Sequence, residues 1–214
     1  MKIAILDYGA GNLRSVHKAF THVGLDAEIT SEPARARSAG GLVLPGVGAF
    51  GKSMENLHRF GLSDVVYEHV AAGRPFAGIC VGLQLLFERS AERFDAAAGG
   101  DAGDPVGLGL LAGQVLRFPE SVRIPQIGWN QLRIRKPEPL FRGVAEGAHV
   151  YFLHSYYAKP QDPRVIAAGC DYGVEYCAAL AHENLVALQF HPEKSGRVGL
   201  AILANLGAWM HSRV

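Results

Sequence analysis

The sequence has few cysteines, little net charge and no long apolar run. Three of its 214 residues are cysteine, and 21 Lys and Arg residues face 20 Asp and Glu residues, so the formal net charge is +1. This balance excludes the broad basic surface that binds nucleic acid or an anionic membrane. No apolar stretch approaches the ~20 residues that a membrane-spanning helix needs, and the N-terminus lacks the apolar stretch of a signal peptide. We therefore expect a cytoplasmic protein.

The cysteine and histidine content also limits the chemistry. The odd number of cysteines and the absence of a C-x-x-C pair exclude a disulfide framework, and we expect Cys170 and Cys177 to be buried, inert thiols. The nine histidines form no H-E-x-x-H motif, so we expect no metal site. The glycines at positions 9 and 11 lack the spacing of a dinucleotide-binding fingerprint, and we expect no cofactor.

The patterning of apolar residues predicts an α/β fold. Apolar runs that end at glycine-rich turns alternate with segments in which apolar residues recur at helical spacing. We predict buried strands at residues 2–6, 26–30, 41–44, 75–79 and 185–190 and helical segments around 13–23, 62–69, 83–87 and 198–209, the last one capped by Ser195. Repeated strand-turn-helix units predict an open, mainly parallel sheet with flanking helices.

The second half of the chain has a different pattern. Between residues 112 and 181, short apolar segments alternate with turns and prolines, so 150–153, 164–169 and 175–180 are expected to add antiparallel strands to the sheet. Residues 95–105 are small and almost without core-forming side chains, and we expect a flexible surface insertion there. With 49% hydrophobic residues, the chain is expected to form one domain over residues 1–214.

The third cysteine lies at a sharp predicted turn. Residues 78–82 have the form G-x-C-x-G between a predicted strand and a predicted helix, which is the nucleophile-elbow arrangement with Cys80 in place of serine. Such a side chain is held outside the carboxyl end of the sheet, where ligands bind in open α/β folds. The helix N-terminus favours a thiolate, and its free N–H groups can hold an oxyanion. The alternative is a tight turn with an incidental cysteine.

A histidine and a glutamate follow the last predicted strand. His191, Pro192 and Glu193 should therefore lie at the same end of the sheet as Cys80. Because Pro192 fixes φ and residues two apart in an extended segment point the same way, Glu193 can reach the imidazole of His191. Alone, the pair is typical of a surface histidine beside a solvated glutamate. Together with Cys80 it favours a Cys-His-Glu triad, in which the carboxylate sets the histidine tautomer.

The turn after the strand at 41–44 is a further candidate. Its sequence is Pro45-Gly46-Val47-Gly48, and two glycines around Val47 let the backbone approach a ligand. A turn of this kind can supply a second oxyanion N–H, although Pro-Gly turns are common.

These motifs together resemble the class I, or triad, glutamine amidotransferases. Residues 80–87, C-V-G-L-Q-L-L-F, are similar to the C-x-G-x-Q-L-L-F motif of that family, and His191 and Glu193 match its other triad positions. The resemblance implies a flavodoxin-like fold and hydrolysis of glutamine through a thioester on Cys80. It implies oxyanion donors at Val47 and Val81, and a glutamine site lined by Gly48, Gln84, Glu92, Ser155 and Tyr156.

Three further segments resemble one branch of the family, the glutaminase subunits of imidazole glycerol phosphate synthases. They are residues 7–15, 45–50 and 125–130. The resemblance implies a heterodimer with a (β/α)8-barrel cyclase that receives the ammonia. It also implies interface positions at Asn12, Trp129, Tyr151 and Lys194. For Trp129 the alternative is a core aromatic residue.

Other classes of protein remain as alternatives. The nearest is the glutaminase subunit of another class I amidotransferase, against which residues 7–15 and 125–130 argue. A hydrolase of the α/β-hydrolase fold would place its acid between nucleophile and histidine, whereas Glu193 follows His191. A non-catalytic binding module on the same fold is disfavoured by the intact Cys80, His191 and Glu193.

Overall fold

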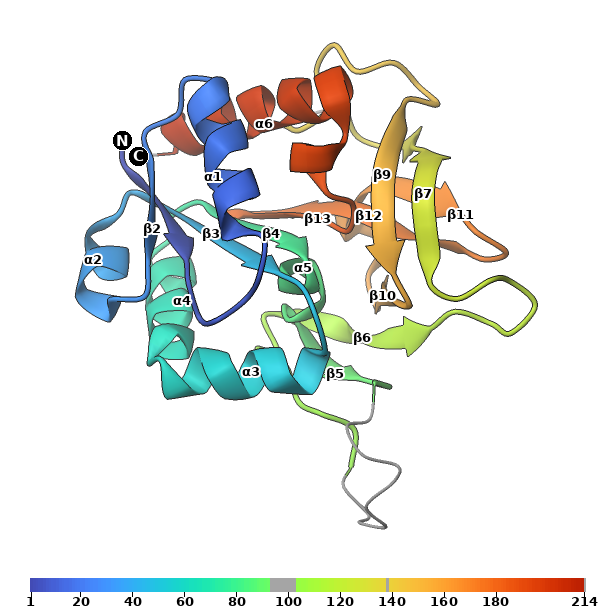
Figure 1. The fold of residues 1–214 in the computed structure, drawn as a ribbon, viewed down its shortest axis with the longest axis horizontal. Helices are drawn as coiled ribbons and strands as arrows, with labels where there is room; N and C mark the ends of the chain where they lie inside the picture. Colours follow the sequence, from blue (N-terminus) through green and yellow to red (C-terminus); the bar gives the residue numbers. More distant parts are fainter. Residues whose placement is uncertain (93–102, 138, 214) are drawn as a thin grey trace.

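An eight-stranded sheet forms the centre of the computed structural model, which describes residues 1–92, 103–137 and 139–213 (Figure 1). The strand order is β2-β1-β3-β4-β13-β12-β11-β8, in which the strands from β2 to β13 run parallel and the last three are added in antiparallel pairs. The strands are β1 (Ile3–Leu6), β2 (Ala27–Thr30), β3 (Gly41–Gly46), β4 (Phe76–Cys80), β8 (Arg133–Ile134), β11 (Ile166–Asp171), β12 (Glu175–His182) and β13 (Leu185–Leu188). The predicted mainly parallel sheet is confirmed.

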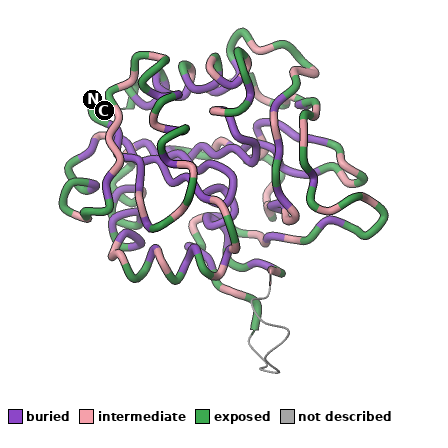
Figure 2. The backbone as a smooth tube through the Cα atoms, viewed as in Figure 1, coloured by how far each residue is buried: buried purple, intermediate pink, exposed green. Residues whose placement is uncertain are grey.

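Helices cover both faces of this sheet. In Figure 1, α1 (Leu13–His22) and α6 (Gly196–His211) lie above it, and α3 (Phe50–Arg59) and α4 (Leu62–Ala71) lie below it, with α2 (Pro33–Ser38) against α4. Strands β1, β3, β4 and β13 are buried along their whole length, as the purple centre of Figure 2 shows. Burial on both faces explains why these strands are continuous apolar runs without alternation.

Two small sheets stand beside the central one. One contains β5 (Phe87–Ser90), β6 (Leu111–Arg117) and β10 (Tyr156–Pro160), and the other pairs β7 (Gln126–Gln131) with β9 (His149–His154). The prediction that residues 150–153 join the main sheet is therefore wrong, because β9 pairs with β7 instead. The additions predicted at 164–169 and 175–180 do join it, as β11 and β12.

The prediction of a helix around residues 83–87 is also wrong in its bounds. The helix α5 (Val81–Gln84) is a single turn, and Phe87 begins β5. Two 3-10 turns, η1 (Pro163–Val165) and η2 (Pro192–Lys194), complete the described elements. The predicted insertion at 95–105 lies largely outside the described residues, which resume at residue 103. Within the described part of the chain, no helix is both long enough and apolar enough to span a membrane.

Candidate active site

The chain turns sharply at Cys80, where β4 ends and α5 begins. Cys80 has φ 56° and ψ −112°, a conformation that a residue with a side chain adopts only when its surroundings impose it. A Cβ atom on Gly78 would collide with the backbone of Gly82, and one on Gly82 would collide with the carbonyl of Leu44. Both glycines are therefore required for the turn. The predicted nucleophile elbow is present, and it holds the thiol at the carboxyl end of the parallel strands.

His191 and Glu193 are in contact at the same end of the sheet. The distance from His191 Nδ1 to Glu193 Oε1 is 2.9 Å, and the two side chains are 2% and 1% exposed. The predicted contact is confirmed, but the extended geometry behind it is wrong. Pro192 begins the 3-10 turn η2, and this tight turn brings the carboxylate back against the imidazole.

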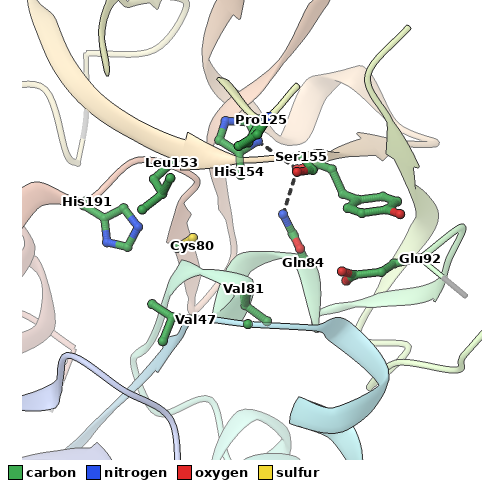
Figure 3. Close-up of a pocket in the computed structure, with 12 residues that line it drawn as sticks. Val47, Cys80, Val81, Gln84, Glu92, Pro125, Leu153, His154, Ser155 and His191 are labelled. Atoms are coloured by element: carbon green, nitrogen blue, oxygen red, sulfur yellow. Dashed lines mark hydrogen bonds between the residues drawn. The ribbon is translucent and has the colours of Figure 1, made fainter. Parts of the chain in front are cut away.

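The imidazole of His191 shares a pocket with the thiol of Cys80 (Figure 3). Among the described residues, the buried Nε2 atom of His191 has no hydrogen-bond partner. Burial by itself lowers the pKa of His191, but the interactions with Cys80 and Glu193 outweigh it and raise the pKa to about 10. The contact with Glu193 therefore favours the protonated imidazole, which lies in the same pocket as the Cys80 thiol.

The pocket around Cys80 has a volume of about 250 Å³. Its lining includes every residue predicted for the oxyanion and glutamine sites, namely Val47, Gly48, Val81, Gln84, Glu92, Ser155 and Tyr156. Pro125, Leu153 and His154 also line the pocket, although none of them was predicted as a site residue. They come from β9 and from the segment before β7, whose position over the elbow could not be inferred from the chain order.

Two of the predicted glutamine-site residues have fixed side chains. Glu92 Oε2 accepts a hydrogen bond from the backbone N–H of Phe50 at 2.7 Å, and burial raises the pKa of the Glu92 carboxyl. Gln84 Nε2 donates to the carbonyl of Tyr156 at 2.8 Å and to Gln189 Oε1 at 3.1 Å. These contacts hold both side chains at the wall of the pocket.

The sequence reasoning missed Gln189. This side chain is fully buried, and its Nε2 atom lies 3.9 Å from Cys80 Sγ. The signal was available, because Gln189 lies two residues before His191 and continues β13 toward the same end of the sheet.

Asn12 was predicted from the family resemblance as an interface residue, and it also contacts the triad. Its Nδ2 atom lies 2.6 Å from Glu193 Oε1, and it adopts a left-handed conformation with φ 68° in the turn before α1. Asn12 is half-buried, so one part of it supports Glu193 while another part reaches the surface.

Ser195 occupies the predicted N-cap position of α6, where its carbonyl accepts a hydrogen bond from the backbone N–H of Gly199 at 3.0 Å. Its hydroxyl makes no side-chain cap hydrogen bond at the start of α6. Instead, Ser195 Oγ donates to the carbonyl of His191 at 2.6 Å and accepts from the backbone N–H of Tyr151 at 3.0 Å. The backbone N–H of His191 also donates to the carbonyl of Tyr151 at 2.9 Å. These hydrogen bonds hold strand β9 against the turn that carries His191 and Glu193.

The sheet of β7 and β9 has an apolar outer face. In the antiparallel register Ile127 lies opposite Leu153 and Trp129 opposite Tyr151. Ile127 is 61% exposed and Trp129 56%, so the alternative of a core aromatic at position 129 is wrong. We call these four residues the β7–β9 face. Leu153 also lines the Cys80 pocket, so this face borders the active site, and Lys194 Nζ lies 5.8 Å over the Tyr151 ring.

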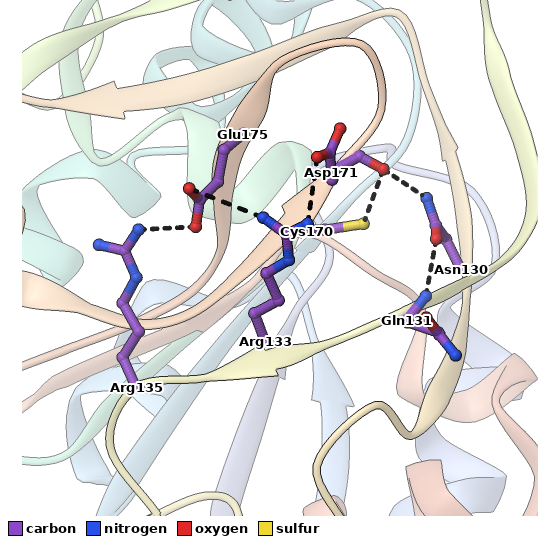
Figure 4. Close-up of polar contacts among 7 residues, drawn as sticks. All are labelled: Asn130, Gln131, Arg133, Arg135, Cys170, Asp171 and Glu175. Atoms are coloured by element: carbon purple, nitrogen blue, oxygen red, sulfur yellow. Dashed lines mark hydrogen bonds and ion pairs between the residues drawn. The ribbon is translucent and has the colours of Figure 1, made fainter.

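The other two cysteines are buried, as predicted. Cys170 and Cys177 are 0% and 1% exposed, and burial raises both pKa values, that of Cys177 to about 12. In Figure 4, Cys170 lies among polar side chains near the sheet edge, with its Sγ 3.9 Å from the carbonyl of Asp171, whose carboxylate pairs with Arg133 at 3.2 Å. Neither thiol has the surroundings of a nucleophile.

The comparisons with known proteins identify the family. The model of the family described as "Glutamine amidotransferase class-I" matches residues 4–207. The chain belongs to the class-I glutamine amidotransferase family. Among its curated relatives, the imidazole glycerol phosphate synthase subunit HisH of Geobacter sulfurreducens is 51% identical over 213 residues, which cover 96% of this chain and 98% of that protein. The protein of the same name from Aquifex aeolicus is 47% identical, with coverage of 96% and 95%.

Solved structures share the amidotransferase fold. PurLQS from Thermotoga maritima matches with a TM-score of 0.75 and 17% identity, covering 97% of this chain and 98% of that one. The glutaminase domain of CTPS from Trypanosoma brucei matches with a TM-score of 0.65 and 15% identity, covering 100% and 95%. At these identities the likeness establishes the fold alone, and the predicted flavodoxin-like amidotransferase architecture is confirmed.

Proposed function

We propose that this amidotransferase is the glutaminase subunit of an imidazole glycerol phosphate synthase. It hydrolyses glutamine to glutamate and ammonia, and it passes the ammonia to a cyclase subunit in histidine biosynthesis. The observation that carries the proposal is the strained Cys80 elbow sharing one pocket with His191, whose Nδ1 atom lies 2.9 Å from Glu193. The relatives with this subunit's name cover nearly the whole chain.

The catalytic cycle uses the three triad residues. The Cys80 thiolate attacks the side-chain carboxamide carbon of glutamine and forms a tetrahedral oxyanion. His191 gives its proton to the departing nitrogen, ammonia leaves, and a glutamyl thioester remains on the sulfur. His191 then takes a proton from a water molecule that attacks the thioester, and glutamate and the thiolate are released. Glu193 holds the Nδ1 side of the imidazole throughout.

Backbone N–H groups stabilise the oxyanion in this proposal. Val81 is the first residue of α5, and the first amides of a helix have no acceptor within the helix. Val47 also lines the pocket, between Gly46 and Gly48, and Gly48 has φ +100°. Glycines on both sides of Val47 permit the peptide rotation that would aim its N–H at the oxyanion.

Five residues form the glutamine site in this proposal. Gly48, Gln84, Glu92, Ser155 and Tyr156 share the pocket with Cys80. The carboxylate of Glu92 lies at one wall and can pair with the α-ammonium group of glutamine, while Ser155 and Tyr156 line the same pocket.

The partner is proposed to be a (β/α)8-barrel cyclase that docks on the β7–β9 face as a heterodimer. Exposed apolar side chains that border a reaction pocket are typical of a protein interface. Trp129 and Tyr151 form an edge-to-face pair with centroids 6.2 Å apart, and Lys194 is exposed beside them. Asn12 reaches the surface from the other side of Glu193. Docking there would cover the pocket and retain the ammonia.

We further propose that the chain acts as one amidotransferase domain, because the family model matches residues 4–207 without a division. The cytoplasmic location and the surface insertion at 95–105 stay predictions.

A glutaminase assay tests the proposal. We expect slow glutamine hydrolysis by the chain alone and strong stimulation by the barrel cyclase with its nucleotide ligand. Hydrolysis that the cyclase leaves unchanged would point to another class I amidotransferase. No hydrolysis under either condition would favour a binding module.

A further inference from the structure

A chain of buried polar groups runs along one wall of the pocket and ends at the nucleophile. Both His154 Nδ1 and Gln84 Nε2 lie 2.8 Å from the carbonyl oxygen of Tyr156, contacts that are dashed in Figure 3. Gln84 Nε2 also contacts Gln189 Oε1 at 3.1 Å, and Gln189 Nε2 lies 3.9 Å from Cys80 Sγ. Gln84 and Gln189 are 3% and 0% exposed, so water does not replace these contacts.

The carbonyl of Tyr156 fixes the direction of the hydrogen bonds in this series of side chains. A backbone carbonyl can only accept, so Gln84 must turn its NH2 group toward Tyr156, and the same nitrogen then donates to Gln189. Gln189 must turn its oxygen toward Gln84 to accept that bond. Its NH2 group is then the part of the amide that faces Cys80. Rotating the Gln189 amide by half a turn would place two NH2 groups against each other.

We propose that Gln189 donates a hydrogen bond to the Cys80 thiolate and stabilises it, with Gln84 as the positioning residue that sets the orientation of Gln189. The inference rests on the proposed glutaminase function for its biological role. A donor held against sulfur favours the anion over the thiol, because the thiolate is the better acceptor. Gln84 therefore has a purpose beyond contact with glutamine.

Other polar side chains lie near the sulfur, and none of them belongs to the hydrogen-bonded series that runs from His154 to Gln189. His191, directly before η2, lines the same pocket as Cys80, with Glu193 behind it, and the buried Tyr8, two residues beyond β1, donates to the carbonyl of Pro45 at 2.8 Å. Substitution of Gln189 removes none of these side chains. The effect of the amide can therefore be measured against a constant background.

The test is the pH dependence of Cys80 alkylation by iodoacetamide in the full chain, followed by mass spectrometry of the Cys80 peptide. Gln189→Met keeps the side-chain length but has no donor. We expect the midpoint of the alkylation profile to rise by about one pH unit, and kcat for glutamine at neutral pH to fall about tenfold with KM nearly unchanged. Gln189→Glu places a carboxylate against the sulfur, so its midpoint should rise further.

A matched control is available at another buried glutamine. Gln126 is 2% exposed and accepts from Tyr176, whose hydroxyl also meets His154 Nε2 at 3.4 Å, but Gln126 contacts neither Gln84 nor Gln189. Gln126→Met should leave the alkylation midpoint unchanged. If Gln189→Met does not fold, Gln84→Met provides the test, because Gln189 then loses the donor that orients it and the midpoint should rise.

Midpoints that stay at the wild-type pH in both Gln189→Met and Gln84→Met would overturn the inference. A midpoint that rises equally in Gln126→Met would also overturn it, because the effect would then be one of packing. Alkylation needs no glutamine, so the two proposals are tested separately. A shifted alkylation midpoint without glutaminase activity would support this inference and contradict the proposed function. Glutaminase activity with an unshifted midpoint would do the opposite.

Discussion

Asn12 Nδ2 lies 2.6 Å from Glu193 Oε1, the same oxygen atom that meets His191 Nδ1 at 2.9 Å. Within the described part of the chain, the other carboxylate oxygen of Glu193 is buried without a hydrogen-bond partner. The orientation of the triad acid therefore depends on two donors, one of which comes from the turn before α1. This turn also reaches the surface, so Asn12 connects a candidate docking region to the catalytic histidine.

Removing the Asn12 side chain should slow catalysis. We expect Asn12→Gly to lower kcat about tenfold, since a charge-assisted hydrogen bond contributes roughly 1.5–3 kcal/mol and part of it is recovered by water. Glycine accepts the left-handed conformation at φ 68°, so the backbone is not strained by the change. Steady-state glutaminase kinetics measure the effect. Asn12→Asp, which sets two carboxylates together, should be slower still, and an unchanged kcat in both variants would contradict the role of Asn12.

Acid should destabilise the fold through buried histidines. Burial lowers the pKa values of His69 and His154 from 6.5 to about 4. Between these pH values the unfolded chain binds protons that the folded chain does not bind. The free energy of unfolding therefore falls as the pH falls from 6.5 to 4, by about 1.4 kcal/mol per pH unit for each such histidine.

His69→Gln tests this dependence away from the active site. His69 Nε2 contacts the carbonyl of Pro75 at 3.1 Å, and a glutamine can keep that contact. Urea unfolding at several pH values should give a shallower slope between pH 6.5 and 4 than in the wild type. His22→Gln, at an exposed position near the end of α1, is the matched control. A slope that His69→Gln leaves as steep as before would refute the assignment.

The β7–β9 face should carry much of the affinity for the cyclase. Trp129 is 56% exposed, and we expect Trp129→Ala to weaken binding by about 2 kcal/mol, or about thirtyfold in Kd, as for an aromatic residue at an interface centre. Calorimetric titration with the cyclase measures this. Val106→Ala is the control, because Val106 is 72% exposed but lies beside β5. Equal affinities of Trp129→Ala and the control would place the interface elsewhere.

Lys194 should couple docking to catalysis. It follows Glu193 directly, and its ammonium group lies 5.8 Å over the ring of Tyr151, whose backbone is fastened to His191 through Ser195. We expect Lys194→Ala to lower the cyclase-stimulated glutaminase rate while the thermal unfolding midpoint of the isolated chain stays unchanged. Stimulation as strong as in the wild type would count against this coupling.

The parallel core of the fold could be predicted because its strands are apolar runs between glycine-rich turns. Strands β5, β6 and β7 were not predicted, because their burial patterns follow neighbours that are distant in the sequence. Helix α3 was not predicted either, although its buried residues Phe50, Met54 and Leu57 recur at helical spacing. In β7, for example, Trp129 faces outward, so the alternation of buried and exposed positions does not coincide with hydrophobicity. The α5 turn was predicted too long because Leu86 and Phe87 fit helical spacing but lie in a chain that turns into β5.

The site was more predictable than the contacts that support it. The Cys80 elbow follows from two glycines whose spacing has a steric reason. The contact between His191 and Glu193 was predicted for an extended segment, although a 3-10 turn produces it. The position of Gln189, two residues before His191, could have been inferred from the sequence, whereas the contact of Asn12 with Glu193 depends on a distance between segments that only the tertiary structure determines.

The proposed function requires above all that Cys80 release ammonia from glutamine for use by a cyclase. This is measured by the formation of imidazole glycerol phosphate when the chain is mixed with the barrel cyclase, with either glutamine or ammonium salt as the nitrogen source. We predict that Cys80→Ala abolishes the glutamine-dependent reaction and leaves the ammonia-dependent reaction intact. Glutamine-dependent product from Cys80→Ala, or none from the wild-type chain, would contradict the proposed function.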